Sequence, residues 1–99
     1  MLSKLNEEVE LLGRHITILK FVIENSPIGI IKLSELSGCP QHKVRYSLRI
    51  LEEQDLIKPS LQGAVATRKA EKFIKAFPKK LRKLIDKLTK LGEHNTSSF

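Results

Sequence analysis

The sequence predicts a single, mainly helical domain of 99 residues with one short β-hairpin. Apolar residues make up 40% of the chain but aromatic residues only 5%, so the core must be built from Leu, Ile and Val at regular spacing. These residues follow helical spacing along most of the chain, and the period changes near Pro59 and Gly63. A chain of this length has enough apolar surface for one core, so two independent folding units are not expected.

The first helix is predicted from the strongest periodicity in the sequence. Apolar residues recur at alternating steps of three and four, at Leu2, Leu5, Val9, Leu12, Ile16, Leu19 and Ile23. Ser3 suits a helix start because Glu7 and Glu8 follow it. The stretch ENSP at 24–27 ends the pattern. Gly13 is a candidate break, so one long helix and two consecutive helices both fit.

A short helix is predicted after this turn. The stretch IKLSELSG at 31–38 corresponds to about two helical turns that end at Gly38. Leu33 and Leu36 are expected to face inward. Ile30, just before the helix, fits one short extended segment.

The next helix has two chemically different sides. Pro40 suits its first position, where a missing N–H is no loss, and the helix is expected to end near Gln54. Its apolar side is formed by Val44, Leu48 and Leu51. On or near the opposite side lie His42, Arg45, Tyr46 and Arg49.

The remaining chain is predicted to form a hairpin and a basic helix. The change of period in LIKPSLQGAVAT, at 56–67, indicates a small hairpin. Thr67 is a suitable N-cap for the helix that follows. Pro78 is expected to break that helix before it continues to Gly92, and 93–99 are expected to form a flexible tail.

The net charge of +7 is concentrated in one segment. Residues 1–67 carry eight Lys or Arg and eight Asp or Glu, whereas residues 68–90 carry ten and two. Such a segment attracts polyanions, although a Lys-rich helix face is as often simply solvated. One cysteine cannot form an internal disulfide, and we find no signal-peptide pattern and no apolar stretch that could cross a bilayer. We therefore expect a cytoplasmic protein that does not span a membrane.

The sequence predicts no catalytic site and no metal site. Cys39 and His42 have a spacing that a metal could use, but no second pair completes a tetrahedral site, and a buried Cys in a turn is the simpler interpretation. His15 and His94 are expected on a helix flank and in the tail. No nucleophile, base and acid are predicted to converge, and no phosphate-binding glycine loop is present. We therefore expect no enzymatic activity and no cofactor.

The order of the predicted elements, three helices and then a hairpin, resembles a winged helix-turn-helix. The stretch VRYSLRILEEQDLIKPS at 44–60 is similar to the recognition helix and the start of the hairpin in winged-helix transcription regulators, especially small archaeal ones. Ser34 and Cys39 supply the small residues that suit the junction of the two motif helices. Asp55 stands where family members typically carry Gly in a left-handed turn. The resemblance covers residues 15–77.

This resemblance implies a protein whose third helix enters the major groove of double-stranded DNA. The predicted DNA contacts are Gln41, His42, Lys43, Arg45, Tyr46, Arg49, Lys58 and Arg68. On the helix, Lys43 and Arg49 are assigned to phosphates and the other four residues to base edges. Glu52 and Glu53 mark the expected end of the contact, because phosphates repel them. An ordinary solvated helix side is the alternative for this face.

Both ends of the chain carry apolar stripes that a monomer of this size is not expected to cover. The predicted homodimer interface consists of Leu81, Leu84, Leu88, Leu91, Leu5, Val9 and Leu12. A membrane surface and the domain's own core are the alternative partners of the C-terminal stripe. The acidic stretch NEEVE at 6–10 is a candidate contact for the basic helix, within or between chains.

These inferences divide the chain into an N-terminal helical extension (1–14), a winged helix-turn-helix domain (15–77), a basic amphipathic helix for dimerisation (78–92) and a flexible tail (93–99). They predict a transcriptional regulator that binds specific double-stranded DNA sequences as a homodimer. A protein-interaction module in a larger complex is the alternative, and RNA binding is a weaker one. The sequence identifies neither the DNA target, nor the sign of regulation, nor an effector.

Overall fold

The computed structural model describes residues 1–93 as four helices and one antiparallel two-stranded hairpin. In chain order the elements are α1 (Leu2–Asn25), α2 (Ile30–Ser37), α3 (Gln41–Glu53), β1 (Ile57–Ser60), β2 (Gly63–Ala66) and α4 (Arg68–Glu93). The predicted mainly helical fold with one short hairpin is confirmed. Glu93 is the last residue of α4, and the rest of the predicted tail, 94–99, lies outside the described residues.

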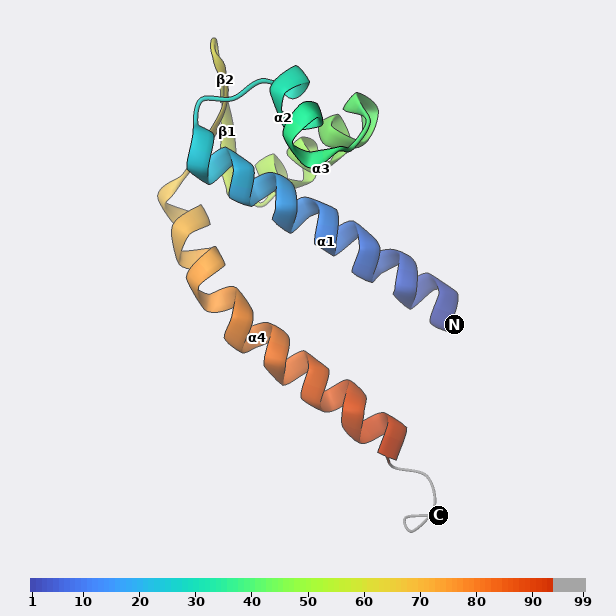
Figure 1. Cartoon of the computed structure of the whole chain (residues 1–99). Coiled ribbons are helices and arrows are strands. Elements are labelled where there is room, and N and C mark those ends of the chain that lie inside the picture. Colours follow the sequence, from blue (N-terminus) through green and yellow to red (C-terminus); the bar gives the residue numbers. More distant parts are fainter. Residues whose placement is uncertain (94–99) are drawn as a thin grey trace.

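The molecule is elongated because its two long helices extend away from the other elements. Figure 1 shows α2, α3 and the hairpin gathered toward one end of α1, while the N-terminal part of α1 and most of α4 project from that body. The principal extents are 59 × 27 × 21 Å, and the Cα radius of gyration is 16.3 Å, against about 13 Å for a compact domain of this length. No helix within residues 1–93 has the length and apolar character needed to cross a membrane.

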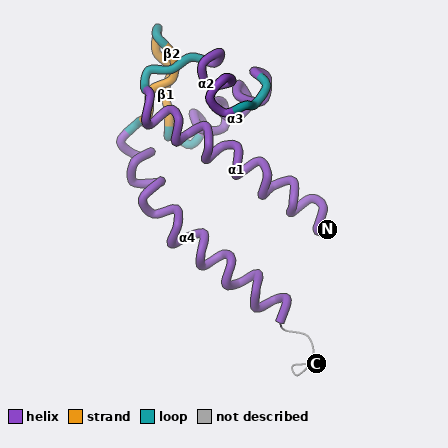
Figure 2. Tube along the Cα trace, in the orientation of Figure 1, coloured by secondary structure: helices purple, strands orange, loops and turns teal. Residues whose placement is uncertain are grey.

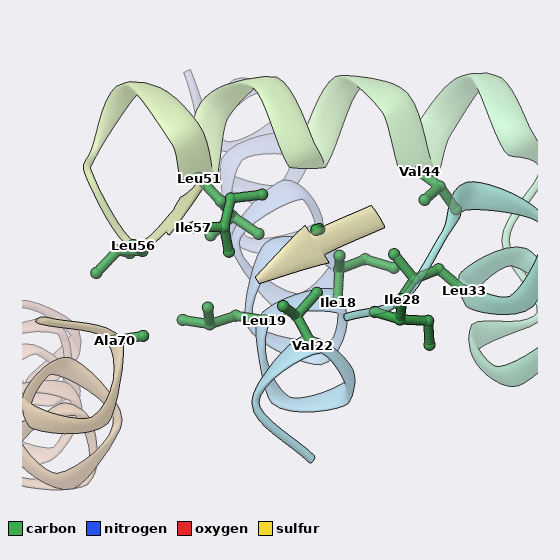
Figure 3. Close-up of a cluster of buried hydrophobic side chains, with 11 residues drawn as sticks. Ile18, Leu19, Val22, Ile28, Leu33, Val44, Leu51, Leu56, Ile57 and Ala70 are labelled. Carbon is green, nitrogen blue, oxygen red and sulfur yellow. The ribbon is translucent and has the colours of Figure 1, made fainter. Parts of the chain in front are cut away.

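The hydrophobic core lies where the C-terminal half of α1 meets α2, α3, the hairpin and the first turn of α4 (Figure 3). Its buried residues are Ile18, Leu19, Val22, Ile28, Leu33, Val44, Leu51, Leu56, Ile57, Ala64 and Ala70. Leu33 faces inward as predicted, but the prediction for Leu36 is wrong, because its side chain is 40% exposed. The inward face of α2 passes through Ile30, Leu33, Ser34 and Ser37, and Leu36 lies beside that face.

Both long helices are continuous. α1 passes through Gly13 without a break, so the single-helix alternative is the correct one. The break predicted at Pro78 is absent, since α4 continues through this residue. Pro78 has no N–H to donate to the carbonyl of Ile74, so the helix continues without that one hydrogen bond.

Backbone and side-chain hydrogen bonds fix the turn between α2 and α3. Gly38 adopts the left-handed conformation, with φ of 72°, and its N–H donates to the Ser34 carbonyl at 2.9 Å. The Ser34 hydroxyl donates to the Cys39 carbonyl at 2.6 Å. Pro40 precedes α3 as its N-cap and is not the first helical residue, which is Gln41. These contacts set the direction in which α3 leaves the turn.

The hairpin is joined to the segment before α2 (Figure 2). The extended residue predicted at Ile30 lies at Ile28 instead, since Ile30 already begins α2. The N–H of Ile28 donates to the Ala64 carbonyl at 3.1 Å, and the N–H of Ala64 donates to the Ile28 carbonyl at 2.8 Å. Gly63 beside this bridge has φ of 128°, and a Cβ there would collide with the Ile28 backbone. Only glycine fits this position without displacement.

Asp55 forms the turn after α3. Asp55 has φ of 60°, the left-handed conformation for which glycine is more usual. Its N–H donates to the Glu52 carbonyl at 3.0 Å. The hydroxyl of Thr67 donates to the Asp55 carbonyl at 2.8 Å and accepts the N–H of Ala70 at 3.3 Å. Thr67 therefore caps α4 as predicted and also supports the turn that starts the hairpin.

Candidate nucleic-acid interface

One side of α3 is packed against the core, and this packing determines which residues the helix exposes. Val44, Ser47 and Leu51 recur at steps of three and four and are all buried. The residues on the remaining sides are exposed: Gln41, His42, Lys43, Arg45, Tyr46 and Arg49. All six residues predicted on this helix are therefore accessible to a partner.

Tyr46 connects α3 to α1 and orients a neighbouring arginine. The Cζ atom of Arg49 lies 5.2 Å from the centroid of the Tyr46 ring, within the range of a cation–π contact. The His15 ring on α1 lies 5.9 Å from the Tyr46 ring, with a tilt of 41°. Tyr46 thus has contacts on α1 and on its own helix while remaining 37% exposed.

A hydrogen-bonded cluster that the sequence interpretation missed lies behind this ring. The buried Ser47 hydroxyl accepts the Nε–H of Arg14 at 3.2 Å and lies 2.8 Å from Nδ1 of His15. Burial and then the positive charge of Arg14 lower the pKa of His15 from 6.5, while Glu8 acts in the opposite direction. Ser47 can therefore donate its own hydrogen to a neutral His15 ring. A serine at an apolar position of α3 was the sequence signal for this cluster.

The two arginines of α3 have no carboxylate partner among the described residues. The ion pairs found in residues 1–93 are Lys32 with Glu35, at 3.9 Å, and Asp86 with Lys90, at 3.2 Å. Glu52 and Glu53 are exposed at the C-terminal end of α3, but neither is paired with Arg45 or Arg49. Both guanidinium groups are thus available to an external anion or to a base edge.

A groove of about 840 Å³ lies between α2, α3 and the hairpin. Gln41 and Arg45 line it on the α3 side, and its charged lining residues are Lys32, Glu35, Arg45 and Glu52, two of each sign. Its apolar lining includes Ile28, Ile31, Leu48, Ile57, Pro59 and Leu61. The groove therefore has no net charge, unlike the outward side of α3.

The two predicted contacts outside α3 occupy different places. Lys58 lies on β1 between Ile57 and Pro59, both of which line the groove, so strand alternation directs Lys58 toward the other face of the hairpin. Arg68 is the first residue of α4. Both are exposed, and neither lines the groove. The structure thus groups six of the predicted contacts on α3 and places these two elsewhere.

No candidate metal centre is found in the described part of the chain, where no three His, Cys, Asp or Glu side chains form a suitable group. Cys39 is only partly buried, and its thiol lies 4.0 Å from the Ser37 carbonyl oxygen. His42 is exposed on α3.

Comparison with known proteins does not assign the chain to a family. A scan against models of protein families finds no match, and a search of curated proteins finds none either. The geometry and charge of the surfaces described above therefore provide the basis for a functional proposal.

Proposed function

We propose that the protein is a winged helix-turn-helix regulator of transcription that binds specific double-stranded DNA sequences as a cytoplasmic homodimer. In this proposal α3 is the recognition helix and the β1–β2 hairpin is the wing. The main supporting observation is the exposed side of α3, which carries Lys43, Arg45 and Arg49 and has no acidic residue before Glu52. The proposal includes neither a catalytic activity nor a cofactor.

The side chains of α3 match the chemistry of the major groove. Arg45 can form two parallel hydrogen bonds with guanine, and Gln41 can pair with adenine in the same way. His42 and Tyr46 are the other candidates for base contacts. Arg49 is better placed for a phosphate, because its stacking on Tyr46 orients the guanidinium along the helix surface. The buried side of α3 fixes the rotation that presents all of these groups together.

The hairpin is expected to add little sequence reading. Its two strands pair from Ile57 to Ala66, and its loop consists of Leu61 and Gln62. Leu61 is fully exposed and neither loop residue is charged, so the tip offers no cation to a phosphate. Specificity should therefore come mainly from α3. A symmetric dimer would place two copies of α3 in successive major grooves, about 34 Å apart, on an inverted repeat.

Selection from random double-stranded DNA, followed by sequencing at two salt concentrations, tests this proposal. We expect an enriched inverted repeat. Replacing both Arg45 and Arg49 with Ala should abolish the enrichment, because Arg45 is assigned to a base edge, and should lower the magnitude of the slope of log affinity against log salt by about one, because Arg49 is assigned to a phosphate. The matched control replaces Lys4 and Lys20 with Ala, which removes the same charge from α1. Equal losses in both variants, or no loss in either, would overturn the assignment of α3.

A protein-interaction module is the second candidate, and the uncharged groove favours it. Ile31 is 65% exposed and Leu61 is fully exposed at the groove, and such apolar side chains suit a protein partner better than a phosphate backbone. If the selection enriches no sequence and the protein does not bind DNA at low salt, this second function replaces the first.

A further inference from the structure

Two helical segments project from the body of the protein without a covering partner (Figure 1). We call residues 2–13 the α1 arm and residues 77–93 the α4 arm. Many of their apolar side chains are exposed, namely Leu2 75%, Leu5 44%, Val9 55%, Leu84 48%, Leu88 41% and Leu91 71%, whereas Leu11, Leu12, Phe77 and Leu81 are partly buried. The hydrophobic core and the side chains packed against it reach α4 only as far as Ile74. Each arm therefore exposes an apolar stripe.

The α1 stripe reaches a cavity in the body of the protein, which the first two turns of α4, before the α4 arm, also line. This cavity has a volume of about 250 Å³ and lies where α1, α3 and α4 come together. Leu12 and Ile16 line it from α1, and Phe73 lines it from α4. A helix that packs along the α1 stripe would thus also lie over the apolar residues of this cavity. Unpartnered apolar surface of this extent usually marks an interface.

The charges beside the stripes differ in sign. Residues 2–13 carry three Glu and one Lys, whereas residues 77–93 carry six Lys or Arg and two acidic residues. Glu8 is three residues after Leu5 and four before Leu12, so helical spacing places it directly beside the α1 stripe.

On the α4 arm the same spacing places lysines beside the stripe. Lys80 is three residues after Phe77 and four before Leu84, and Lys87 stands in the same relation to Leu84 and Leu91. Neither lysine is in an ion pair found among residues 1–93, and the same holds for Glu8. Pairing of two α4 arms would bring lysines together, whereas pairing of an α4 arm with an α1 arm would bring opposite charges together.

We infer that a second copy of the chain covers both arms by exchange: the α4 arm of each protomer packs along the α1 arm of its partner. Lys80 and Lys87 then lie beside the partner's Glu8, and the two-fold symmetry of a homodimer repeats the contact. This inference rests on the homodimer of the proposed function and specifies its surfaces. It concerns residues outside α3, so it can be tested without DNA.

Charge reversal with sedimentation velocity at low ionic strength tests the exchange. The wild-type chain should sediment as a dimer. Glu8→Lys should raise the dissociation constant about tenfold, and so should the pair Lys80→Glu with Lys87→Glu, because each change places like charges together at both copies of the contact. The matched control is Glu7→Lys, which makes the same charge change on the side of α1 opposite the apolar stripe and should leave the dimer intact. Circular dichroism checks that each variant remains folded.

Mixing the two kinds of variant distinguishes exchange from contact within one chain. A chain with Glu8→Lys and a chain with both lysines reversed should form a heterodimer of about wild-type affinity, since each contact then joins opposite charges. No recovery on mixing would overturn the exchange, as would a wild-type chain that remains monomeric. A dimer that becomes tighter on reversing the lysines would indicate pairing of two α4 arms and would also overturn it.

Two further outcomes separate this inference from other possibilities. A monomeric wild-type chain that sediments with phosphatidylserine vesicles would assign the α4 arm to a membrane surface and overturn the exchange. A dimer that responds to the charge reversals as expected, but enriches no DNA sequence, would support the exchange while contradicting the proposed function.

Discussion

Nδ1 of His15 lies 2.8 Å from the hydroxyl oxygen of Ser47, and this contact joins α1 to the buried side of α3. Arg14 donates to the same hydroxyl at 3.2 Å. Since the adjacent residue, Tyr46, is exposed and contacts the His15 ring, the cluster supports the proposed binding face from behind. A change in this cluster can therefore alter both the stability of the fold and the orientation of the exposed side chains.

Replacing Ser47 with Ala removes the hydroxyl that both α1 side chains contact. We expect the free energy of unfolding to fall by about 1 kcal/mol, because Arg14 and His15 lose a hydrogen bond but remain close enough to solvent to bond water. Urea denaturation measures this loss. Thr17→Ala is the control, since the Thr17 hydroxyl is exposed and bonds only its own helix. Equal effects of the two changes would show that the cluster does not contribute to stability.

The titration of His15 predicts how stability depends on pH. Burial, and then Arg14, lower the pKa of the folded state below 6.5, so between these two pKa values the unfolded chain binds more protons than the folded chain. The contribution of neutral His15 to stability is fully present above about pH 6.5 and decreases as the pH falls toward the lower pKa.

Chemical denaturation of the wild type and of His15→Gln across pH 5 to 8 checks this prediction. The stability difference between the two proteins should become smaller, or less favourable to the wild type, as the pH falls below 6.5. Subtracting the two stabilities cancels the contribution of the carboxylates, which titrate in the same way in both proteins. A constant difference across this range would contradict a lowered pKa for His15.

Gly63 should tolerate substitution far less well than Gly13. Gly63→Ala places a Cβ against the Ile28 backbone at φ of 128°, and we expect it to cost about 3 kcal/mol, from backbone strain and displacement of the bridge between Ile28 and Ala64. Gly13→Ala meets nothing within 4 Å and lies inside α1, so it should stabilise the protein by about 0.5–1 kcal/mol. Thermal unfolding of both variants tests the contrast, and similar transition temperatures would contradict it.

The sequence predicts the local features of this fold better than the contacts between its elements. Gly38 and Thr67 can be assigned from short-range rules, because a left-handed C-cap and an N-cap depend on neighbours within a few residues. The exposed side of α3 is predictable for the same reason. The prediction for Leu36 is wrong because its exposure is set by the elements packed around α2. The prediction for Pro78 is wrong because a proline disfavours a helix interior locally, whereas the turns on both sides of it are helical in α4.

The cluster around Ser47 could not be predicted from spacing alone. His15 and Ser47 are 32 residues apart in the chain and meet only because α1 crosses behind α3. The bridge between Ile28 and Ala64 is a second long-range contact of this kind. Because of this contact the extended residue is Ile28, whereas the sequence predicts Ile30. Both contacts depend on how the elements are placed relative to one another, and helical periodicity carries no information about that placement.

Tyr46 should contribute to DNA binding mainly through its ring. The ring contacts both Arg49 and His15, and Tyr46→Phe retains these contacts while it removes only the hydroxyl. We therefore expect Tyr46→Phe to bind the selected DNA within about threefold of the wild type, and Tyr46→Leu to bind about tenfold more weakly, because Arg49 then loses a cation–π contact. Fluorescence anisotropy with a labelled duplex measures both affinities. If Tyr46→Phe binds as weakly as Tyr46→Leu, the hydroxyl itself contacts DNA and the positioning role of the ring is wrong.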